Sequence, residues 1–426
     1  MITNQTTMLS RRSFLSKSFT ISGMLAFPHI LKGSYSNSPN HRIGVGFIGA
    51  GGNIMRGHNG LSTNPQVEPL YFCDVKRGQL DIVHRKYQKM GYTGIKAVEH
   101  FEEVIEDPNV DAVIIGTPDH WHVAIAIAAM SKGKDVYVEK PMSLTVEEGK
   151  AMVEAERKYQ RIVQVGSQQR SDPNFRHAAT LVRNGYIGDI LEIHVRLGSF
   201  AEPMLQDPEM IPEGFNYDKW LGPAPYQPYF ASRVAGNKKQ HPGWRMYLDY
   251  GCRKNGNWGA HHYDITQWAL GQDTTGPTLF VPKGYQGEPY DYFQYQNGIK
   301  VFRDSGKYPS MITFIGSEGK IGVGRGNHFT STNRALQSLS LNSADQRLYE
   351  SNDHRKNWLE GIYSRKKAIC DAQIGHRTAS ICQLGTIAKQ LSRPIHWDPK
   401  EEKILQDPLA MRFLSRPRRA GYPLPS

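Results

Sequence analysis

The chain has 426 residues, 39% of them hydrophobic and 22% charged, which is typical of a globular protein with one large or two medium domains. Its formal net charge of +12 first suggests a nucleic-acid partner, but four of these charges lie in the first 40 residues, which leaves +8 for the remainder. That remainder has no dense Lys/Arg run interleaved with aromatic residues, so we expect no nucleic acid as a partner. The four cysteines form no CxxC pair, and we expect neither a dense disulfide framework nor a metal site.

Residues 1–40 are predicted to be an export signal and its linker. Ser-Arg-Arg-Ser-Phe-Leu-Ser-Lys at 10–17 precedes a moderately apolar run at 18–31, which serines, Gly23 and Pro28 interrupt. This pattern resembles a twin-arginine signal, and a basic amphipathic helix is the alternative. Because a membrane span takes ~20 predominantly apolar residues, we expect no stable span here. We expect the protein to be exported to the periplasm or otherwise out of the cytoplasm.

Between residues 41 and 167, short β-rich runs alternate with amphipathic stretches, the pattern of a parallel sheet covered by helices. Thr145 and Glu148 form a capping box that starts one of these helices. We therefore predict an N-terminal Rossmann domain with a doubly wound parallel sheet. The expected strands are 43–48, 67–73, 110–115, 135–138 and 161–165, and the expected helices are 123–130 and 145–159.

From residue 168 to 395 the predicted strands are longer, and an Asn297-Gly298 turn joins two of them. This favours a C-terminal α+β domain with a large, mostly antiparallel open sheet, followed by a tail at 396–426 that packs on the body. The segment 202–243 is rich in Pro, Gly and aromatic residues, and loops of this length are often functional. The expected strands are 191–197, 290–296 and 311–315, and the expected helices are 261–270, 352–363 and 375–391.

A glycine-rich turn comes after the first predicted strand and opens a helix. Its glycines would let the backbone approach a pyrophosphate at the helix N-terminus, although Ile54 stands where a third glycine is usual. A tight turn in an unrelated α/β domain is the alternative. The residues predicted to contact a dinucleotide here are Gly49, Gly51, Gly52, Asn53 and Ile54.

Asp74 ends the second predicted strand, 22 residues beyond Gly52. A carboxylate at this distance typically hydrogen-bonds the adenosine ribose of NAD. Lys76 and Arg77 come shortly after it and could meet a 2′-phosphate. The sequence therefore favours NAD as the cofactor and keeps NADP possible.

Two further motifs come directly after predicted strands: Gly-Thr-Pro-Asp-His-Trp-His at 116–122 and Glu-Lys-Pro at 139–141. They resemble the glucose-fructose oxidoreductase/inositol dehydrogenase (Gfo/Idh/MocA) family. The likeness implies a Rossmann domain, a substrate domain with an open sheet and a homodimer or homotetramer. It covers nearly the whole chain after the leader and continues at 166–170, 258–264, 314–319, 397–399 and 415–419.

The resemblance also implies roles for individual residues. Glu139 would hold the nicotinamide ribose or carboxamide, and Lys140 would point at the substrate carbinol. Because Lys140 comes after a strand of an open α/β sheet, it lies where such sheets bind ligands, whereas a solvated surface lysine is the alternative. The other expected contacts at the nicotinamide half are Thr117, Pro118, Trp121 and His122, and Lys140, Gln168 and Trp258 are further expected cofactor contacts.

The second catalytic element of the family is Asp-x-x-x-His on a helix, where residues four apart share one face. In this chain the two positions are Asn257 and His261, so the histidine is present and the carboxylate is missing. We expect His261 to act as general acid/base, and a core histidine satisfied by the backbone is the alternative. Lys140 is expected to stabilise the developing alkoxide and to help proton transfer. Asn257 can donate or accept a hydrogen bond but cannot relay a proton, so either the chemistry tolerates it or another carboxylate, Asp249 or Asp264, substitutes.

Several polar and aromatic residues in the motif-rich stretches are candidates for binding sugar hydroxyls, with mutual ion pairing as the alternative. The predicted substrate contacts are Arg170, Arg245, Asp249, Tyr250 and His262, and Trp244, His376 and Arg377 are further candidates.

Three functions of different kinds are compatible with these residues. The first is an exported NAD(P)-dependent oxidoreductase that acts on a secondary alcohol of a sugar, glycoside or cyclitol and keeps its cofactor tightly bound. The second is a redox-neutral glycosidase or lyase in which transient oxidation at C3 permits elimination. The third is a non-catalytic sugar or cofactor sensor, which Ile54 and Asn257 would explain. Lys140 favours the first.

Overall fold

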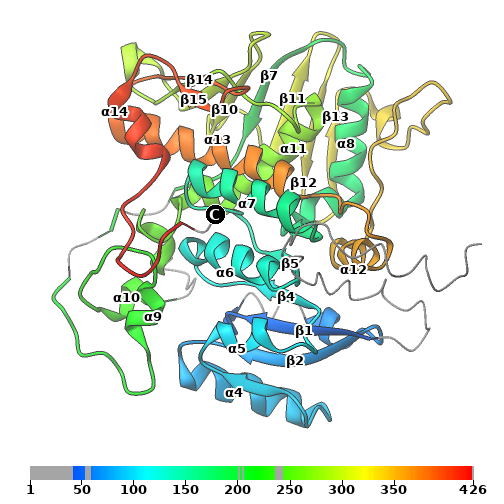
Figure 1. The fold of residues 1–426 in the computed structure, drawn as a ribbon. Helices are drawn as coiled ribbons and strands as arrows, with labels where there is room; N and C mark the ends of the chain where they lie inside the picture. The colour runs from blue at the N-terminus through cyan, green and yellow to red at the C-terminus, as the bar shows by residue number, and fades with distance from the viewer. Residues whose placement is uncertain (1–41, 53–58, 200–201, 204–205, 236–242, 425–426) are drawn as a thin grey trace, which may run out of the picture. The chain divides into compact units, whose positions relative to one another are not determined.

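The structure is a computed structural model, and it describes residues 42–52, 59–199, 202–203, 206–235 and 243–424 (Figure 1). The predicted export signal and the predicted contacts at Asn53 and Ile54 lie outside these ranges. Within them, no helix combines the length and the apolar character needed to cross a membrane. All four cysteines are buried free thiols.

The first sheet has six parallel strands in the order β3-β2-β1-β4-β5-β6, with the crossover between β1 and β4. This is the doubly wound Rossmann arrangement that the sequence predicts. Strands β1, β4 and β5 are buried along their whole length, which explains why they are apolar runs. The strands are β1 (Ile43–Ile48), β2 (Val67–Cys73), β3 (Lys96–Val98), β4 (Ala112–Ile115), β5 (Asp135–Val138) and β6 (Val163–Val165).

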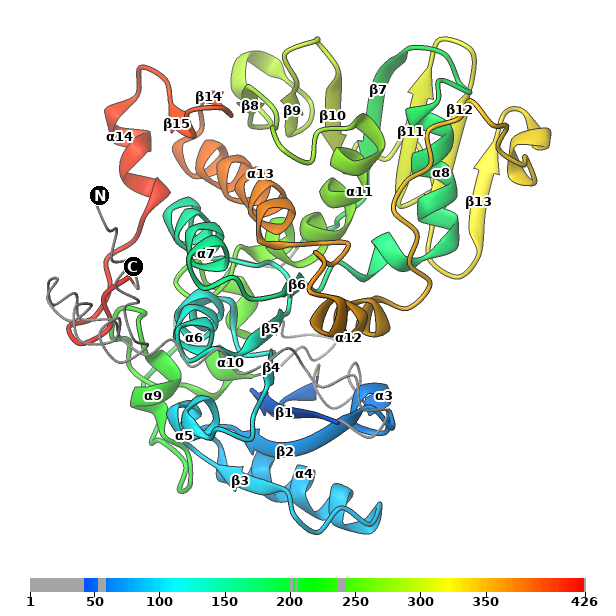
Figure 2. The same ribbon diagram turned by 45° about the vertical axis from the view of Figure 1, so that its right-hand side comes forward.

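Helices cover this sheet and connect it to the rest of the chain. In both ribbon views α7 lies between α6 and α13 (Figures 1 and 2). Thr145 caps α7 by accepting from the Glu148 backbone N–H at 3.2 Å, as predicted. The Glu148 carboxylate, however, accepts from the N–H of Leu144 and not from that of the cap residue. The helices are α3 (Asn59–Ser62), α4 (Arg77–Lys89), α5 (Phe101–Glu106), α6 (Asp119–Ser131) and α7 (Val146–Tyr159).

The second sheet has nine strands in the order β13-β12-β11-β7-β10-β9-β8-β14-β15. Its pairs are antiparallel except β10 with β7, so the prediction of a mostly antiparallel sheet is confirmed. The strands are β7 (Ile190–Val195), β8 (Leu279–Val281), β9 (Tyr292–Gln294), β10 (Lys300–Arg303), β11 (Ile312–Gly316), β12 (Lys320–Gly324), β13 (His328–Ser331), β14 (Ile395–Asp398) and β15 (Lys403–Ile404).

One face of the second sheet packs against helices and forms a large apolar core that includes Trp268, Phe293 and Phe314. Figure 2 shows α8, α11 and α13 on this face. Strand β14 pairs with β8 and crosses the boundary predicted at residue 395, so the tail completes the sheet. The helices are α8 (Pro173–Arg183), α11 (Ala260–Leu270), α12 (His354–Ser364), α13 (Ala372–Leu391) and α14 (Pro408–Met411).

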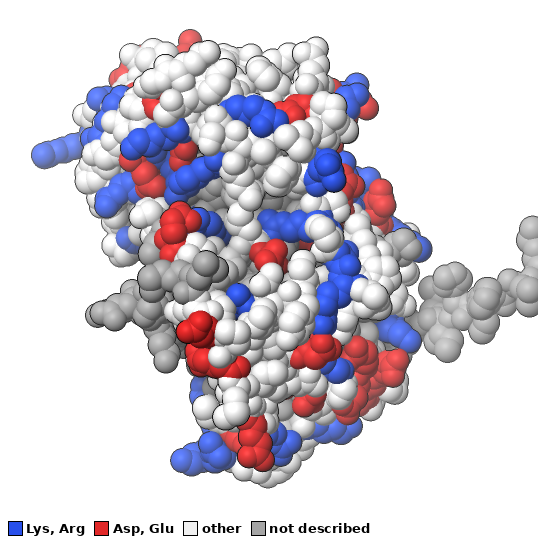
Figure 3. Space-filling model, turned by 90° about the vertical axis from the view of Figure 1, so that its left-hand side faces the viewer, with Lys and Arg blue, Asp and Glu red and all other residues white. Residues whose placement is uncertain are grey.

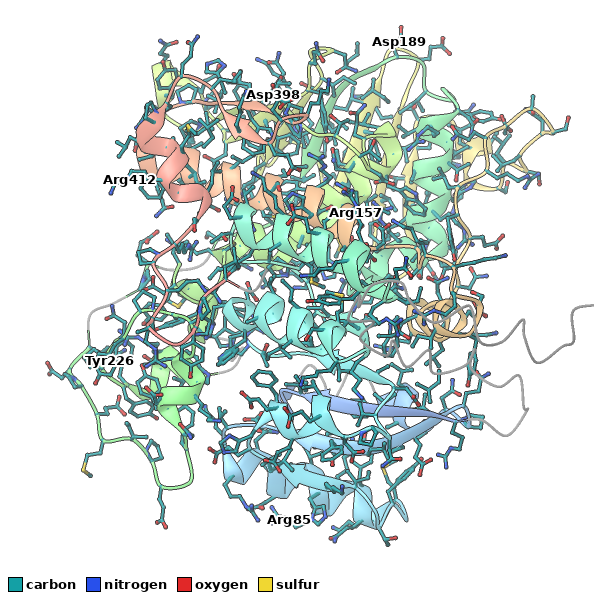
Figure 4. All side chains as sticks on the ribbon, in the orientation of Figure 1. Arg85, Arg157, Asp189, Tyr226, Asp398 and Arg412 are labelled. Carbon is teal, nitrogen blue, oxygen red and sulfur yellow. The ribbon has the colours of Figure 1, made fainter. Side chains whose placement is uncertain are left out.

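The segment predicted as a long functional loop contains two short helices, α9 (Tyr217–Leu221) and α10 (Ala231–Val234). Tyr226 lies exposed between them and points outward (Figure 4). After α14 the C-terminal tail runs back towards α9 and α10 (Figure 1). There Arg419 forms an ion pair with Asp218 at 2.5 Å, while Arg418 forms one with Glu148 of α7 at 2.6 Å. The tail therefore connects the second sheet to the helices of the first.

The face that carries α14, α9 and α10 has a mixed charge. Figure 3 shows Lys and Arg interspersed with Asp and Glu across this face, with several acidic side chains gathered in its lower part. The positive net charge of the chain is therefore not concentrated in a continuous basic surface on this side.

Candidate active site

A cavity of about 360 Å³ opens at the carboxyl ends of β1, β2 and β4. Gly49 closes one side with φ +89°, and a Cβ there would lie 2.8 Å from the Thr117 backbone nitrogen, so only glycine fits. Gly51 also lines the cavity, but a Cβ on it would meet nothing within 4 Å. The glycine turn thus leaves free space beside its backbone at the crossover of the sheet, where dinucleotide phosphates bind in this fold.

Asp74 and Lys76 line the part of the cavity that borders β2. The Lys76 backbone N–H donates to the Asp74 carboxylate at 2.9 Å, while burial raises the pKa of that carboxyl to about 6. The Lys76 ammonium lies 4.5 Å from the centre of the Phe215 ring. Arg77, in contrast, is exposed and pairs with Asp81. The predicted ribose carboxylate is therefore at the cavity, with one of the two predicted 2′-phosphate partners beside it.

The motif at 116–122 lies at the start of α6, and its Thr117, Pro118 and Trp121 line the same cavity. The Trp121 indole N–H lies 3.1 Å from the carbonyl oxygens of Lys219 and Trp220, which hold the ring against α9. Gly222, with φ +48°, lies against this ring and leaves no room for a Cβ. The indole is thus fixed as a wall of the cavity.

His122 does not line the large cavity. Its Nδ1 lies 2.8 Å from the carbonyl oxygen of Pro141, and its Nε2 lies 3.0 Å from that of Thr117. Burial lowers the pKa of the imidazole, so it is neutral and donates to one of these carbonyls at a time. The structure therefore gives His122 a positioning role: it ties the first motif to the second.

A second cavity of about 20 Å³ adjoins the first and shares Thr117, Trp244 and Arg245 with it. This volume admits about one water molecule or one hydroxyl group. Its other lining residues are Asp119, His122, Glu139, Lys140, Pro141, Cys252, Arg253 and Asn257. The second motif and the Asn257 position thus meet beside the expected nicotinamide end.

Lys140 is held at this small cavity by Asn257. Its ammonium donates to the backbone carbonyl of Asn257 at 2.8 Å and to the side-chain oxygen at 3.2 Å. Asn257 belongs to η3, a π-helical turn at Asn255–Gly259 that runs into α11. Burial lowers the pKa of Lys140 to about 8, although the neighbouring Glu139 and Asp119 carboxylates oppose this shift. A neutral amine is therefore accessible near physiological pH.

Glu139 lines the small cavity and is supported by Gln168. The Gln168 amide donates to Glu139 at 3.2 Å and to the Tyr137 hydroxyl at 3.0 Å. A Cβ on Gly166 would lie 2.9 Å from the Glu139 carboxylate, so this glycine allows the close approach. Gln168 itself lines neither the large nor the small cavity, and it orients Glu139 from behind.

His261, predicted as the general acid/base, is buried on the first turn of α11 and lines neither of these cavities. Its Nδ1 has no hydrogen-bond partner among the described residues. Burial, with the charges of Lys140 and Arg325, lowers its pKa well below the ordinary range. A neutral histidine of this kind is a weak base, so the geometry favours Lys140 for proton transfer.

Among the predicted substrate contacts, Arg245 lies at the site. It lines both cavities, and its guanidinium stacks 4.2 Å from the centre of the Trp244 ring, which also lines both. Asp249 lines neither cavity. Tyr250 is buried in an aromatic cluster, 4.8 Å from Trp220.

Arg170 is placed elsewhere by its ion pairs. This side chain is buried and donates to Asp264 at 2.8 Å and to Asp273 at 2.7 Å. The same pairing excludes Asp264 as the substitute carboxylate, because Thr378 occupies its other oxygen. Mutual satisfaction of buried charges explains why these residues lie away from the cavities.

Four other candidates also lie away from the two cavities, within the packed body of the protein. His262 is buried 5.5 Å from the ring of Trp258, and burial lowers its pKa to about 3. Trp258 lies under the Arg325 guanidinium and lines neither cavity. His376 and Arg377 both lie beside the carboxylate of Glu402. Among the described residues, no group of His, Cys, Asp or Glu side chains is arranged to hold a metal ion.

Sequence reasoning missed several residues of the two cavities. Asp119 lies within the motif at 116–122, but the motif assigns it no role. Tyr422 lines the large cavity and packs edge-on against Trp121 at 5.6 Å, and no motif in the tail indicates this. Lys219 and Trp220 of the segment 202–243 also line the large cavity. The composition of that segment predicts a functional loop but does not identify these two residues.

Two curated dehydrogenases are similar to this chain in sequence. The Bacillus subtilis scyllo-inositol 2-dehydrogenase (NAD(+)) is 44% identical over 240 residues, 53% of this chain and 58% of that protein. An inositol 2-dehydrogenase of Salmonella paratyphi B is 30% identical over 175 residues, 40% of this chain and 49% of that protein. The chain thus spans about half the length of the curated relatives that it matches.

The fold is shared with the WlbA dehydrogenase from Bordetella pertussis, solved in complex with NADH and UDP-GlcNAcA. The TM-score is 0.60 at 16% identity, covering 84% of this chain and 99% of that one. Residues 43–167 match the family model described as "Oxidoreductase family, NAD-binding Rossmann fold", and residues 199–424 match "Oxidoreductase family, C-terminal alpha/beta domain". The chain therefore belongs to the GFO/IDH/MocA oxidoreductase family.

Proposed function

We propose that the protein is an exported oxidoreductase that transfers hydride between a secondary alcohol of a sugar, glycoside or cyclitol and a tightly bound nicotinamide cofactor. The observation that carries this proposal is the position of Lys140 at a cavity of hydroxyl size, next to the larger cavity of the glycine turn. The inositol dehydrogenases among the relatives support a ring alcohol as substrate.

The residues of this chain fit a nicotinamide dinucleotide. Free space beside Gly51 suits a pyrophosphate, and Asp74 lies where a ribose hydroxyl would donate to it. Asp74 favours NAD, because a carboxylate repels a 2′-phosphate, whereas Lys76 keeps NADP open. When bound, the nicotinamide supplies the acceptor or donor for the hydride.

The proton chemistry falls to Lys140. During oxidation its neutral amine would take the proton of the substrate hydroxyl, and the resulting ammonium stays hydrogen-bonded to Asn257. Arg245, which stacks on Trp244 at the boundary of the two cavities, would bind a neighbouring hydroxyl and stabilise developing negative charge. For His261, which the sequence predicts as the general acid/base, we propose a positioning role, because it lines neither cavity.

Export and cofactor retention are the further parts of the proposal. The twin-arginine pattern at 10–17 supports export of a folded protein. Outside the cytoplasm a freely exchanging cofactor would be lost, so it must remain bound through successive turnovers. Tyr422 and Trp121, which wall the large cavity, support such retention.

The test is a panel of inositols, aldoses and glycosides, monitored by cofactor absorbance and by product mass in the same reactions. We expect a keto product with reduction of the cofactor for at least one ring alcohol. Lys140→Met should reduce the rate by about 10²–10⁴-fold, while the exposed control Lys132→Met should not. A cofactor that never changes redox state with any substrate would refute the proposal, and release of a free sugar without net reduction would favour the redox-neutral cleavage.

A further inference from the structure

The small cavity contains a carboxylate that the catalytic pattern of the family does not include. Asp119 begins α6, is only 5% exposed and lines this cavity together with Lys140 and Asn257. It reaches the cavity from α6, whereas Asn257 reaches it from the turn before α11. The carboxylate missing at position 257 is therefore supplied to the same cavity by a different element.

The surroundings of Asp119 fit a charged side chain. The positive groups that act on it are Lys140, Arg245 and Arg416, the last from the C-terminal tail, and the backbone N–H of Cys252 donates to it. A Cβ on Gly251 would lie 3.3 Å from the Asp119 carboxylate and one on Gly256 3.8 Å, so the η3 side approaches it closely. Burial has the largest effect and raises the pKa of this carboxyl, and the three positive groups act in the opposite direction.

We propose that Asp119 is the proton-exchange partner of Lys140 and replaces the carboxylate that is absent at position 257. This inference rests on the proposed function for its reaction. In the oxidation, the substrate C–H bond breaks and its electron pair leaves with the hydride for the nicotinamide. The hydroxyl proton bonds to the Lys140 amine, and Lys140 then passes a proton to an oxygen of Asp119. The substrate becomes a carbonyl compound, and the reduction reverses every step.

The acidities of the two groups suit this exchange. Burial raises the pKa of Asp119 to about 7, with Arg245 and Lys140 acting against it, and burial lowers the pKa of Lys140 to about 8. The two pKa values are thus shifted towards each other, which lowers the thermodynamic cost of moving a proton between the groups. Both side chains line the cavity of about 20 Å³, which admits about one hydroxyl group, so the substrate hydroxyl would lie between them.

The experiment uses the full chain and the variants Asp119→Asn, Asn257→Asp and the double variant. Asp119→Asn keeps an oxygen for the Cys252 N–H but removes the proton acceptor. We expect it to lower kcat by at least about tenfold with little change in KM, and to alter the pH profile of kcat. The double variant should regain most of the lost activity, because it restores a carboxylate to the cavity.

A second readout does not depend on turnover. The pH dependence of Lys140 acetylation by acetic anhydride, measured by peptide mass, reports the pKa of its amine. Asp119→Asn should lower that pKa, because it removes a negative neighbour, whereas the exposed control Asp81→Asn should leave it unchanged. If Asp119→Asn does not fold, Asp119→Glu keeps the carboxylate and should retain the wild-type pH profile.

An unchanged Lys140 profile in Asp119→Asn would overturn the pairing, and so would an unchanged kcat profile or a double variant no more active than Asp119→Asn. These outcomes are distinct from failure of the proposed function. If the proposed function is wrong, the wild-type protein will oxidise none of the substrates. The acetylation profile of Lys140 would still decide whether Lys140 and Asp119 interact.

Discussion

Substitution of Arg170 tests whether this residue binds substrate, as the sequence predicts, or stabilises the fold, as the structure indicates. The sequence predicts a substrate contact, whereas the structure buries the guanidinium between Asp264 and Asp273. Asp264 is fully buried, and its remaining partner is the hydroxyl of Thr378 at 3.0 Å. Arg170→Met keeps the length of the side chain but leaves Asp264 as an uncompensated buried carboxylate.

The expected cost comes from this geometry. Removing one partner of a buried ion pair destabilises a protein by about 3–5 kcal/mol. Unfolding entropy of about 2.1 cal/mol/K per residue amounts to about 0.8 kcal/mol/K for residues 42–426, so Tm should fall by about 4–6 °C. Since Arg170 lines neither cavity, kcat/KM per folded molecule should change by less than about twofold.

The assay combines thermal unfolding by circular dichroism with kinetics at a temperature where the variant is folded. Arg170→Met/Asp264→Asn should recover most of the lost stability, because no buried charge is then left unpaired. Arg157→Met is the matched control, since Arg157 is exposed on α7 (Figure 4) and its loss should cost less than about 1 kcal/mol. An unchanged Tm together with a tenfold loss of kcat/KM would refute the structural assignment and restore the substrate contact.

Further predictions concern the pH profile, the cofactor and the tail. The pKa of Lys140 is lowered to about 8, and its neutral amine takes the proton, so kcat/KM for oxidation should rise with pH up to about 8 and then level. For reduction, which needs the ammonium form, kcat/KM should fall as the pH rises through about 8. Stopped assays across pH 6–10 with ~1 pH unit spacing measure both profiles. Asp74→Ser should weaken NAD binding roughly 10–100-fold, as expected for the loss of hydrogen bonds to a charged group, and weaken NADP binding less, measured by fluorescence titration. The variant Tyr422→Ala should release the cofactor about 2–10-fold faster, because it loses the contact with Trp121. The variant Tyr226→Ala is the control and should release the cofactor at the wild-type rate, because Tyr226 is exposed. The two variants are compared by dialysis followed by quantification of the bound cofactor.

Much of the fold could be predicted because local pattern and burial agree in it. Strands β1, β2 and β5 begin and end at the predicted residues, since buried runs between turn residues leave little choice of boundary. Strand β3 was missed because it has three residues, lies at the sheet edge and is partly exposed, so it carries no apolar run. The N-terminus of α6 was also placed too late, because the polar side chains of Asp119 and His120 hide a helical turn.

The site could be predicted where a motif keeps its side chains adjacent in sequence, as for Thr117, Glu139 and Lys140. The contributions of Tyr422 and Arg416 depend on the path of a tail that comes after the second sheet. Long-range placement of this kind leaves no periodicity in the sequence. Arg170 illustrates the opposite error, because a polar residue within a motif can serve packing as well as binding.

The π-helical turn before α11 affects how relatives of this chain should be aligned. A single residue added to or removed from a helix rotates the part before it by about 100° relative to the part after it. At η3 such a length change would present a different side chain or carbonyl to Lys140, while His261 kept its place on α11. Two family members can therefore differ in the partner of this lysine through an insertion alone, and counting four residues back from the histidine then identifies the wrong position.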